Sequence, residues 1–233
     1  MKREPFLNAA KGRGLLAGFA VLLTAAIFTL AGCDTGNNGG GFVPVINIVN
    51  LPSIALQNEP LTLSGIVVPS NAANTTITWT SPRVVNGVFT APSTGDFYVT
   101  AVVENGLPGS LPYTKPFKIT AYDNSSDSIT EAQGTWKNGE MTWQLDGASW
   151  TCTGFNVYEY GATVTESKGI MVRIDASSYV SQVNEIYIPG VGWYPWYSKE
   201  TGAYTLSNYN NTVELTADTD SFSFINGTWT RQP

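Results

Sequence analysis

Histidine is absent from the chain, and this absence excludes more chemistry than any motif in the sequence suggests. Without it, Ser-His-Asp and Cys-His catalysis, histidine-ligated zinc and histidine proton relays are impossible. The chain also has no G-x-G-x-x-G after an expected strand, no G-x-x-x-x-G-K-[ST] and no G-x-S-x-G. We therefore expect no catalytic residues, no metal site and no cofactor, and any catalysis would rest on carboxylates.

Cysteine is nearly as scarce, with two in 233 residues. A framework of disulfides is therefore not expected. Cys152 alternates with Ala148 and Trp150 on one face of an expected strand, where no histidine or nearby basic residue would lower the pKa of its thiol. We predict that Cys152 is a buried structural thiol.

Basic residues are few, because 12 Lys and Arg stand against 18 Asp and Glu, for a formal net charge of −6. Nucleic-acid binding requires clustered Lys and Arg, and so does a polybasic membrane patch. We therefore expect no nucleic-acid partner, and any membrane attachment must come from something other than charge.

The N-terminal segment carries the most specific motif of the chain. A basic head precedes an apolar run over 15–30, and small residues follow before a cut site, as in secretory signals. The run ends in Leu-Ala-Gly-Cys at 30–33, which resembles the lipobox of bacterial lipoproteins. The resemblance implies cleavage between Gly32 and Cys33, and diacylation of Cys33 as the membrane anchor. The alternative is an uncleaved membrane-spanning helix, although the run is short for the roughly 20 residues of a span.

We accordingly expect a helical signal peptide over 1–32 and a flexible Gly/Asn-rich tether over 33–42. Removing the signal peptide leaves eight basic and 17 acidic residues, a formal net charge of −9. The expected location is the cell envelope, with the N-terminal lipid in the outer membrane or at the cell surface. The leaflet stays open, because Asp34 is associated with inner-membrane retention in enterobacterial lipoproteins but not in other phyla.

Residues 43–123 are expected to form a β-sandwich. Short apolar alternations bounded by Pro, Gly and Asn are typical of half-buried strands; Ile46 and Ile48 share one expected face. Asn86-Gly87 predicts a type I′ hairpin turn. The succession of segments 77–82, 86–92 and 95–101 resembles bacterial Ig-like domains, in which a Trp fills the core between the sheets. Such modules mostly serve as spacers or adhesive stalks.

Residues 124–128 form a short polar stretch that we interpret as a solvated linker. Its carboxylates raise the alternative of a calcium site, but such sites need six to eight oxygen ligands.

Residues 129–233 are expected to form an antiparallel β-meander that closes into a barrel. Period-2 alternation and Asn-Gly or Asp-Gly turns at 138–139 and 146–147 predict successive hairpins, and closure would remove the exposed strand edges. The opening Gly-x-Trp at Trp136 resembles the first strand of lipocalins and other calycin barrels. The resemblance implies that Trp136, Trp229 and Arg231 close one end, with Arg231 across the Trp136 ring. The expected fold is thus all-β, an Ig-like sandwich followed by a calycin-like barrel.

The densest aromatic run, at 191–197, has two interpretations. It is either a platform on which a sugar ring or flat ligand stacks, or a strand whose rings belong to the barrel core. The candidate binding residues are Trp193, Tyr194, Trp196 and Tyr197.

A carboxylate pair is the remaining route to catalysis. Glu159 and Glu185 each share strand parity with apolar neighbours, so both would face inward unless local bulges turn them out. A glycosidase needs two such carboxyls in one cleft; this carboxylate-dependent hydrolase is the remote alternative.

The sequence therefore predicts a non-enzymatic exported lipoprotein in which a spacer presents a small barrel. In one hypothesis the barrel binds a small apolar or carbohydrate ligand. In the other it is solid and serves as a structural or adhesive module, through contacts with envelope or host proteins.

Overall fold

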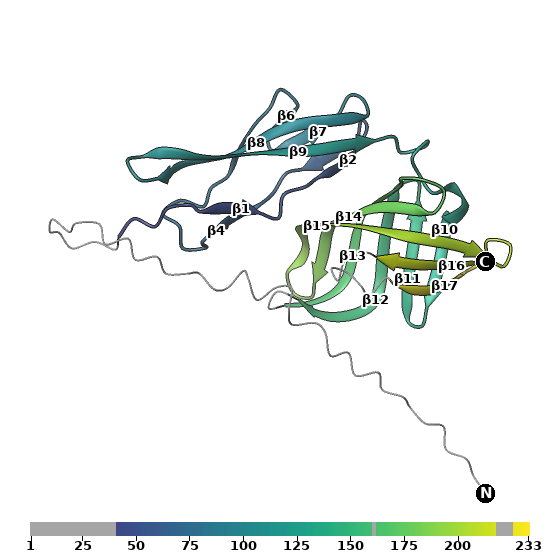
Figure 1. Cartoon of the computed structure of the whole chain (residues 1–233). Helices are drawn as coiled ribbons and strands as arrows, with labels where there is room; N and C mark the ends of the chain where they lie inside the picture. The colour runs from purple at the N-terminus through teal and green to yellow at the C-terminus, as the bar shows by residue number, and fades with distance from the viewer. Residues whose placement is uncertain (1–40, 160–161, 218–225) are drawn as a thin grey trace, which may run out of the picture. The chain divides into compact units, whose positions relative to one another are not determined.

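The computed structural model describes residues 41–159, 162–217 and 226–233, which fold almost entirely as β-strands and turns (Figure 1). The predicted signal peptide, lipobox and most of the tether lie outside these ranges. The one helical element in the described ranges is a short 3-10 helix, η1 (Thr130–Ala132). None of the described residues belongs to a helix long and apolar enough to cross a membrane.

The N-terminal strands form a sandwich-like set of sheets, called the sandwich below. Its four-stranded sheet has the order β2-β9-β8-β5, its three-stranded sheet the order β3-β7-β6, and β1 pairs with β4. The strands are β1 (Asn47–Val49), β2 (Ile54–Leu56), β3 (Pro60–Thr62), β4 (Ile66–Val68), β5 (Thr78–Thr80), β6 (Val84–Val85), β7 (Val88–Thr90), β8 (Gly95–Leu107) and β9 (Leu111–Tyr122).

The predicted turn between β6 and β7 is present. Val85 pairs with Val88, and Asn86 and Gly87 both have positive φ, 51° and 77°, as a type I′ turn requires. The prediction that Ile46 and Ile48 share one half-buried face is wrong for Ile46. Ile48 is fully buried but Ile46 is 69% exposed, because β1 begins only at Asn47 and the residue before it leaves the strand geometry.

The C-terminal strands form the predicted closed antiparallel barrel (Figure 1). Each strand pairs with the next in sequence, and β10 pairs with β17 to complete the closure, with Trp136 opposite Arg231. The strands are β10 (Gly134–Asn138), β11 (Met141–Asp146), β12 (Ser149–Glu159), β13 (Ala162–Arg173), β14 (Ser178–Ile188), β15 (Gly192–Ser207), β16 (Thr212–Ala217) and β17 (Gly227–Arg231).

Two of the predicted barrel turns are displaced by one residue. Asn138 pairs with Met141 and Asp146 with Ser149, so Gly139 and Gly147 occupy the first loop position instead of the second. Both glycines have positive φ, 61° and 58°, which glycine adopts without a side-chain clash. The hairpins are where the sequence predicts them, and only their register differs.

The barrel core is dominated by large rings. Its described core cluster contains seven buried aromatic side chains, namely Trp136, Trp143, Trp150, Phe155, Tyr179, Tyr204 and Trp229. Smaller residues from the same strand faces, including Leu145, Cys152 and Val213, fill the space between these rings. Dense aromatic packing of this kind supplies a large share of the stability of a small barrel.

The outer face of β13 and β14 is also buried. Ile170, Val172 and Val180 form a cluster with Ile54 and Leu56 of the sandwich, whereas Met171, between the first two, belongs to the barrel core. In this part of β13, successive side chains therefore do not alternate between a buried and an exposed face. The continuous apolar run of β13 is explained by burial on both sides of the strand.

Truncation of Trp136 tests the barrel core. Trp136 has no exposed surface, so Trp136→Ala should lower the free energy of unfolding by about 3–5 kcal/mol, as for other large aromatic core residues. Urea denaturation of the full chain measures the loss. Tyr209, which is 98% exposed, provides the control, because Tyr209→Ala should change stability by less than about 0.5 kcal/mol. Similar losses in the two variants would contradict the assigned core.

Candidate functional site

One end of the barrel is closed by Trp136, Trp229 and Arg231. The guanidinium carbon of Arg231 lies 4.5 Å from the ring centroid of Trp136, and its Nη1 donates to the Gln133 carbonyl at 2.7 Å. The Trp136 indole N–H donates to the Ala132 carbonyl at 2.8 Å, which ties the ring to η1. Trp229 is fully buried in the same core. These three residues are structural in this geometry, since each is engaged by protein groups.

The four aromatic residues of the candidate platform lie in different surroundings. Trp193 and Tyr194 are 40% and 43% exposed, whereas Trp196 packs partly buried against the barrel core. Tyr197 is buried in a cluster of sandwich residues, where burial raises the pKa of its hydroxyl. The structure therefore does not assemble the four rings into one surface.

Trp193 instead belongs to a charged outer patch that spans β13 to β15. The Lys168 ammonium lies 4.4 Å from the Trp193 ring centroid and forms an ion pair with Glu185, with a 3.1 Å separation between Nζ and Oε1. The Tyr187 ring meets Trp193 edge-on, with centroids 5.5 Å apart. The Trp193 ring thus contacts Lys168 and Tyr187, and 40% of the residue remains exposed.

The carboxylate pair considered for catalysis is not assembled in the described residues. A register shift between Val183 and Glu185 interrupts the pairing of β14 with its neighbour, so Val183 enters the barrel core while Glu185 reaches Lys168 outside. The side chain of Glu159 lies outside the described residues. Glu185 thus forms a surface ion pair, the outcome expected if a bulge turns it outward.

Of the two cysteine predictions, the structure locates that for Cys152. Cys152 is fully buried in the barrel core, and burial raises the pKa of its thiol to about 12. A thiol in such surroundings remains protonated and is a poor nucleophile. The predicted cleavage and lipidation residues, Gly32 and Cys33, lie outside the described residues.

The most heavily hydrogen-bonded side chain at the junction of sandwich and barrel is Gln182 of β14. It is 1% exposed, and its Oε1 accepts the backbone N–H groups of Ser53 and Ile54 at 2.7 and 3.0 Å. Its Nε2 donates to the Ile54 carbonyl at 3.1 Å and to Asn184 Oδ1 at 2.7 Å. The Gln182 side-chain amide therefore bonds both the backbone N–H and the backbone carbonyl of Ile54, as the backbone of a neighbouring strand would.

Other polar contacts cross the same junction. The Tyr197 N–H donates to Asn50 Oδ1 at 2.7 Å, and the Tyr197 hydroxyl donates to the Thr62 carbonyl. The Ala148 N–H donates to Asn124 Oδ1 at 2.7 Å. Sequence analysis missed this interface, although the continuous apolar run of β13 was a usable sign that its outer face is covered.

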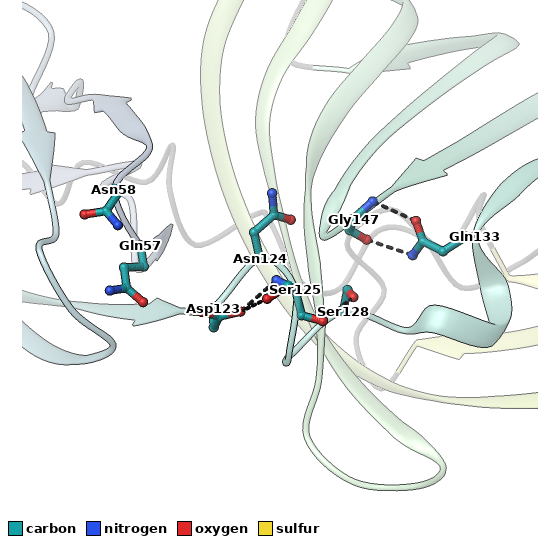
Figure 2. A pocket seen from close by; sticks show the side chains of 8 residues that line it. All are labelled: Gln57, Asn58, Asp123, Asn124, Ser125, Ser128, Gln133 and Gly147. Carbon is teal, nitrogen blue, oxygen red and sulfur yellow. Dashed lines mark hydrogen bonds between the residues drawn. The ribbon is translucent and has the colours of Figure 1, made fainter.

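A polar recess of about 530 Å³ opens beside this junction (Figure 2). Figure 2 shows Gln57 and Asn58 on one side, Asn124 in the middle, and the hydrogen-bonded pair of Gln133 and Gly147 on the other. The recess is lined by Gln57, Asn58, Asp123, Asn124, Ser125, Ser128, Gln133 and Gly147.

A second, half-enclosed recess of about 260 Å³ shares Asn124 with the first. Four of its apolar lining residues are buried and several of its polar lining residues are exposed, a mixture found in many ligand sites. The lining residues are Ala55, Leu56, Glu59, Pro60, Leu61, Asn124, Ser149, Ile170 and Asn184. We call the two together the junction recess.

The polar stretch at 124–128, predicted to be a solvated linker, contains a turn at 124–126 whose three residues are exposed. Asp123 Oδ1 accepts the Ser125 hydroxyl at 2.6 Å and the Ser126 N–H at 2.7 Å, and these bonds hold the pKa of Asp123 down at about 2. Asp127 Oδ2 accepts the Asp123 N–H at 2.8 Å. Both carboxylates thus stabilise the turn, and no group of three potential metal ligands occurs among the residues that the structure describes.

Comparison with protein-family models finds no match to this chain, and comparison with curated proteins finds no significant match either. Function is therefore inferred below from the sequence motifs and from the geometry of the described residues.

Replacement of Gln182 tests the junction. Gln182→Ala would leave the backbone groups of Ser53 and Ile54 buried without their partner, so the free energy of unfolding should fall by about 2–4 kcal/mol. Urea denaturation of the full chain provides the measurement. Gln144→Ala makes the same chemical change at an exposed strand position and should cost less than about 1 kcal/mol. Equal costs would show that the Gln182 amide does not stabilise the junction.

Proposed function

We propose that the protein is a non-enzymatic, lipid-anchored protein of the cell envelope. In this proposal an Ig-like sandwich braces a solid, lipocalin-like barrel, which presents its outer surface to partners. The lipobox at 30–33 supplies the anchor, and its support is the sequence motif alone. The partners are other envelope components or molecules of a host.

The filling of the barrel is the observation that carries this proposal. Trp136 and Trp229 are fully buried, Trp143 is 2% exposed and Trp150 4% exposed. An eight-stranded barrel has an interior just large enough for packed side chains or for one small ligand. Four buried tryptophans in one core favour packed side chains, and this supports a surface role over the carrier alternative.

The sandwich contributes more than distance from the membrane. A spacer linked by a flexible chain would not need to bury Ile54 and Leu56 against the barrel, nor to share hydrogen bonds with Gln182. These contacts support a brace that holds the presented surface in a fixed orientation.

Retention of apolar ligands tests the filled barrel. The full chain, extracted in a dialysable detergent, should retain neither palmitate nor haem in native mass spectrometry after incubation with an excess of each, because packed aromatic side chains occupy the described core. A Trp143→Ala variant is the matched comparison, since an emptied core position creates a cavity that can admit small apolar molecules. Stoichiometric retention of palmitate or haem by the unmodified chain would overturn the proposal in favour of a carrier.

Replacement of Cys33 tests the anchor. Cys33→Ser removes the site of acylation, so the protein should move from the membrane pellet to the soluble fraction after fractionation in high salt. Cys152→Ser is the control, because the buried thiol plays no part in anchoring and this variant should stay with the membrane. Continued sedimentation of the Cys33→Ser protein would contradict the lipid anchor.

A further inference from the structure

We propose that the junction recess binds a neutral oligosaccharide. This inference deepens the proposed function, because it names the class of partner that the presented surface would recognise. It depends on the geometry of the recess, not on the barrel interior.

The chemical character of the walls is the first argument. Eight of the sixteen lining residues carry an amide or a hydroxyl group, among them Asn58, Asn124, Ser149 and Asn184. Each amide carries both a donor and an acceptor, and so does each sugar hydroxyl, so the two kinds of group can pair in either sense. A wall of this composition suits a ligand that presents many hydroxyl groups.

The charge of the recess is the second argument. Among the described lining residues no Lys or Arg occurs, whereas Glu59 and Asp123 carry carboxylates. The expected mature chain is also acidic overall, with a formal net charge of −9 from the sequence. Anionic glycans, phosphates and nucleic acids would be repelled, and a neutral oligosaccharide would not.

The rigidity of the walls is the third argument. Asn124 is held through its Oδ1 by the Ala148 N–H, and Gln133 is bonded to both polar backbone groups of Gly147, as Figure 2 shows. Asn184 accepts from Gln182, which is itself clamped to Ile54. Side chains already fixed by such bonds lose little conformational entropy when a ligand binds.

Two competing assignments are less well supported by the geometry. A peptide could add as a strand to the free edge of β2, but the Gln182 amide already occupies the backbone groups of Ile54 there. A sugar could stack on Trp193, but the Lys168 ammonium lies over that ring. The junction recess is the better candidate because its space is open.

The test is isothermal titration calorimetry of the full chain in detergent with maltotriose, cellotriose and triacetylchitotriose. At least one of these neutral trisaccharides should bind, and trigalacturonate and the peptide Gly-Ser-Asn-Gly should bind at least about tenfold more weakly. Absence of binding by all three neutral probes, or tighter binding of the acid or the peptide, would overturn the proposal.

Two matched pairs of variants locate the site. Ser149→Trp fills the smaller recess and should abolish binding, whereas Thr151→Trp, two residues further along the same exposed strand face, should leave it unchanged. Asn58→Gly should weaken binding about fivefold or more by removing one amide, whereas Asn105→Gly should have no effect. Both asparagines are exposed and have positive φ, 62° and 53°, so glycine fits either backbone without strain.

A further variant separates the recess from the aromatic patch. Trp193→Ala should leave trisaccharide affinity unchanged, and loss of binding in this variant alone would place the site on the outer patch and overturn the proposal. Failure of sugar binding would leave the filled barrel and the anchor intact, because those depend on ligand retention and membrane fractionation instead.

Discussion

The structure depends on one buried amide, that of Gln182, which lies where the barrel wall meets the edge of strand β2. Its hydrogen bonds to Ser53 and Ile54 allow the end of a sheet to be buried without unpaired backbone groups. Because the backbone groups at that edge are hydrogen-bonded, Ile54 and Leu56 can cover the apolar outer face of β13 and β14. An unpaired buried amide would cost free energy, so the polar contact and the apolar contact require each other.

The barrel was the part most accessible to sequence analysis. Its strands alternate with a period of two and its turns carry glycine, so each hairpin is specified by residues close together in the sequence. Closure was also foreseeable, because the first and last strands carry the residues that meet, Trp136 and Arg231. Local patterns sufficed where each strand pairs with its neighbour in the chain.

Sequence-based predictions were less successful where an irregularity in strand pairing changes the face of the strand on which a residue lies. A one-residue shift exchanges the two faces of a strand, so the irregular pairing between Val183 and Glu185 decides that Glu185 faces Lys168 outside the barrel. The same irregularity lies opposite 196–197, where Trp196 packs toward the core and Tyr197 toward the sandwich. The alternation of apolar and polar residues cannot by itself locate a bulge, because no particular amino-acid type identifies the extra residue.

The junction could not be derived from local patterns, because its partners are more than 120 residues apart in the sequence. Its consequence for function follows from rigidity. When the walls of a recess come from two parts of the chain, ligand binding ordinarily costs conformational entropy, because it restricts the relative motion of those parts. Here the shared apolar cluster and the Gln182 bonds hold the walls together before any ligand arrives. The proposed solid barrel would then support the proposed surface site, since a densely packed wall deforms less than a wall around a hollow interior.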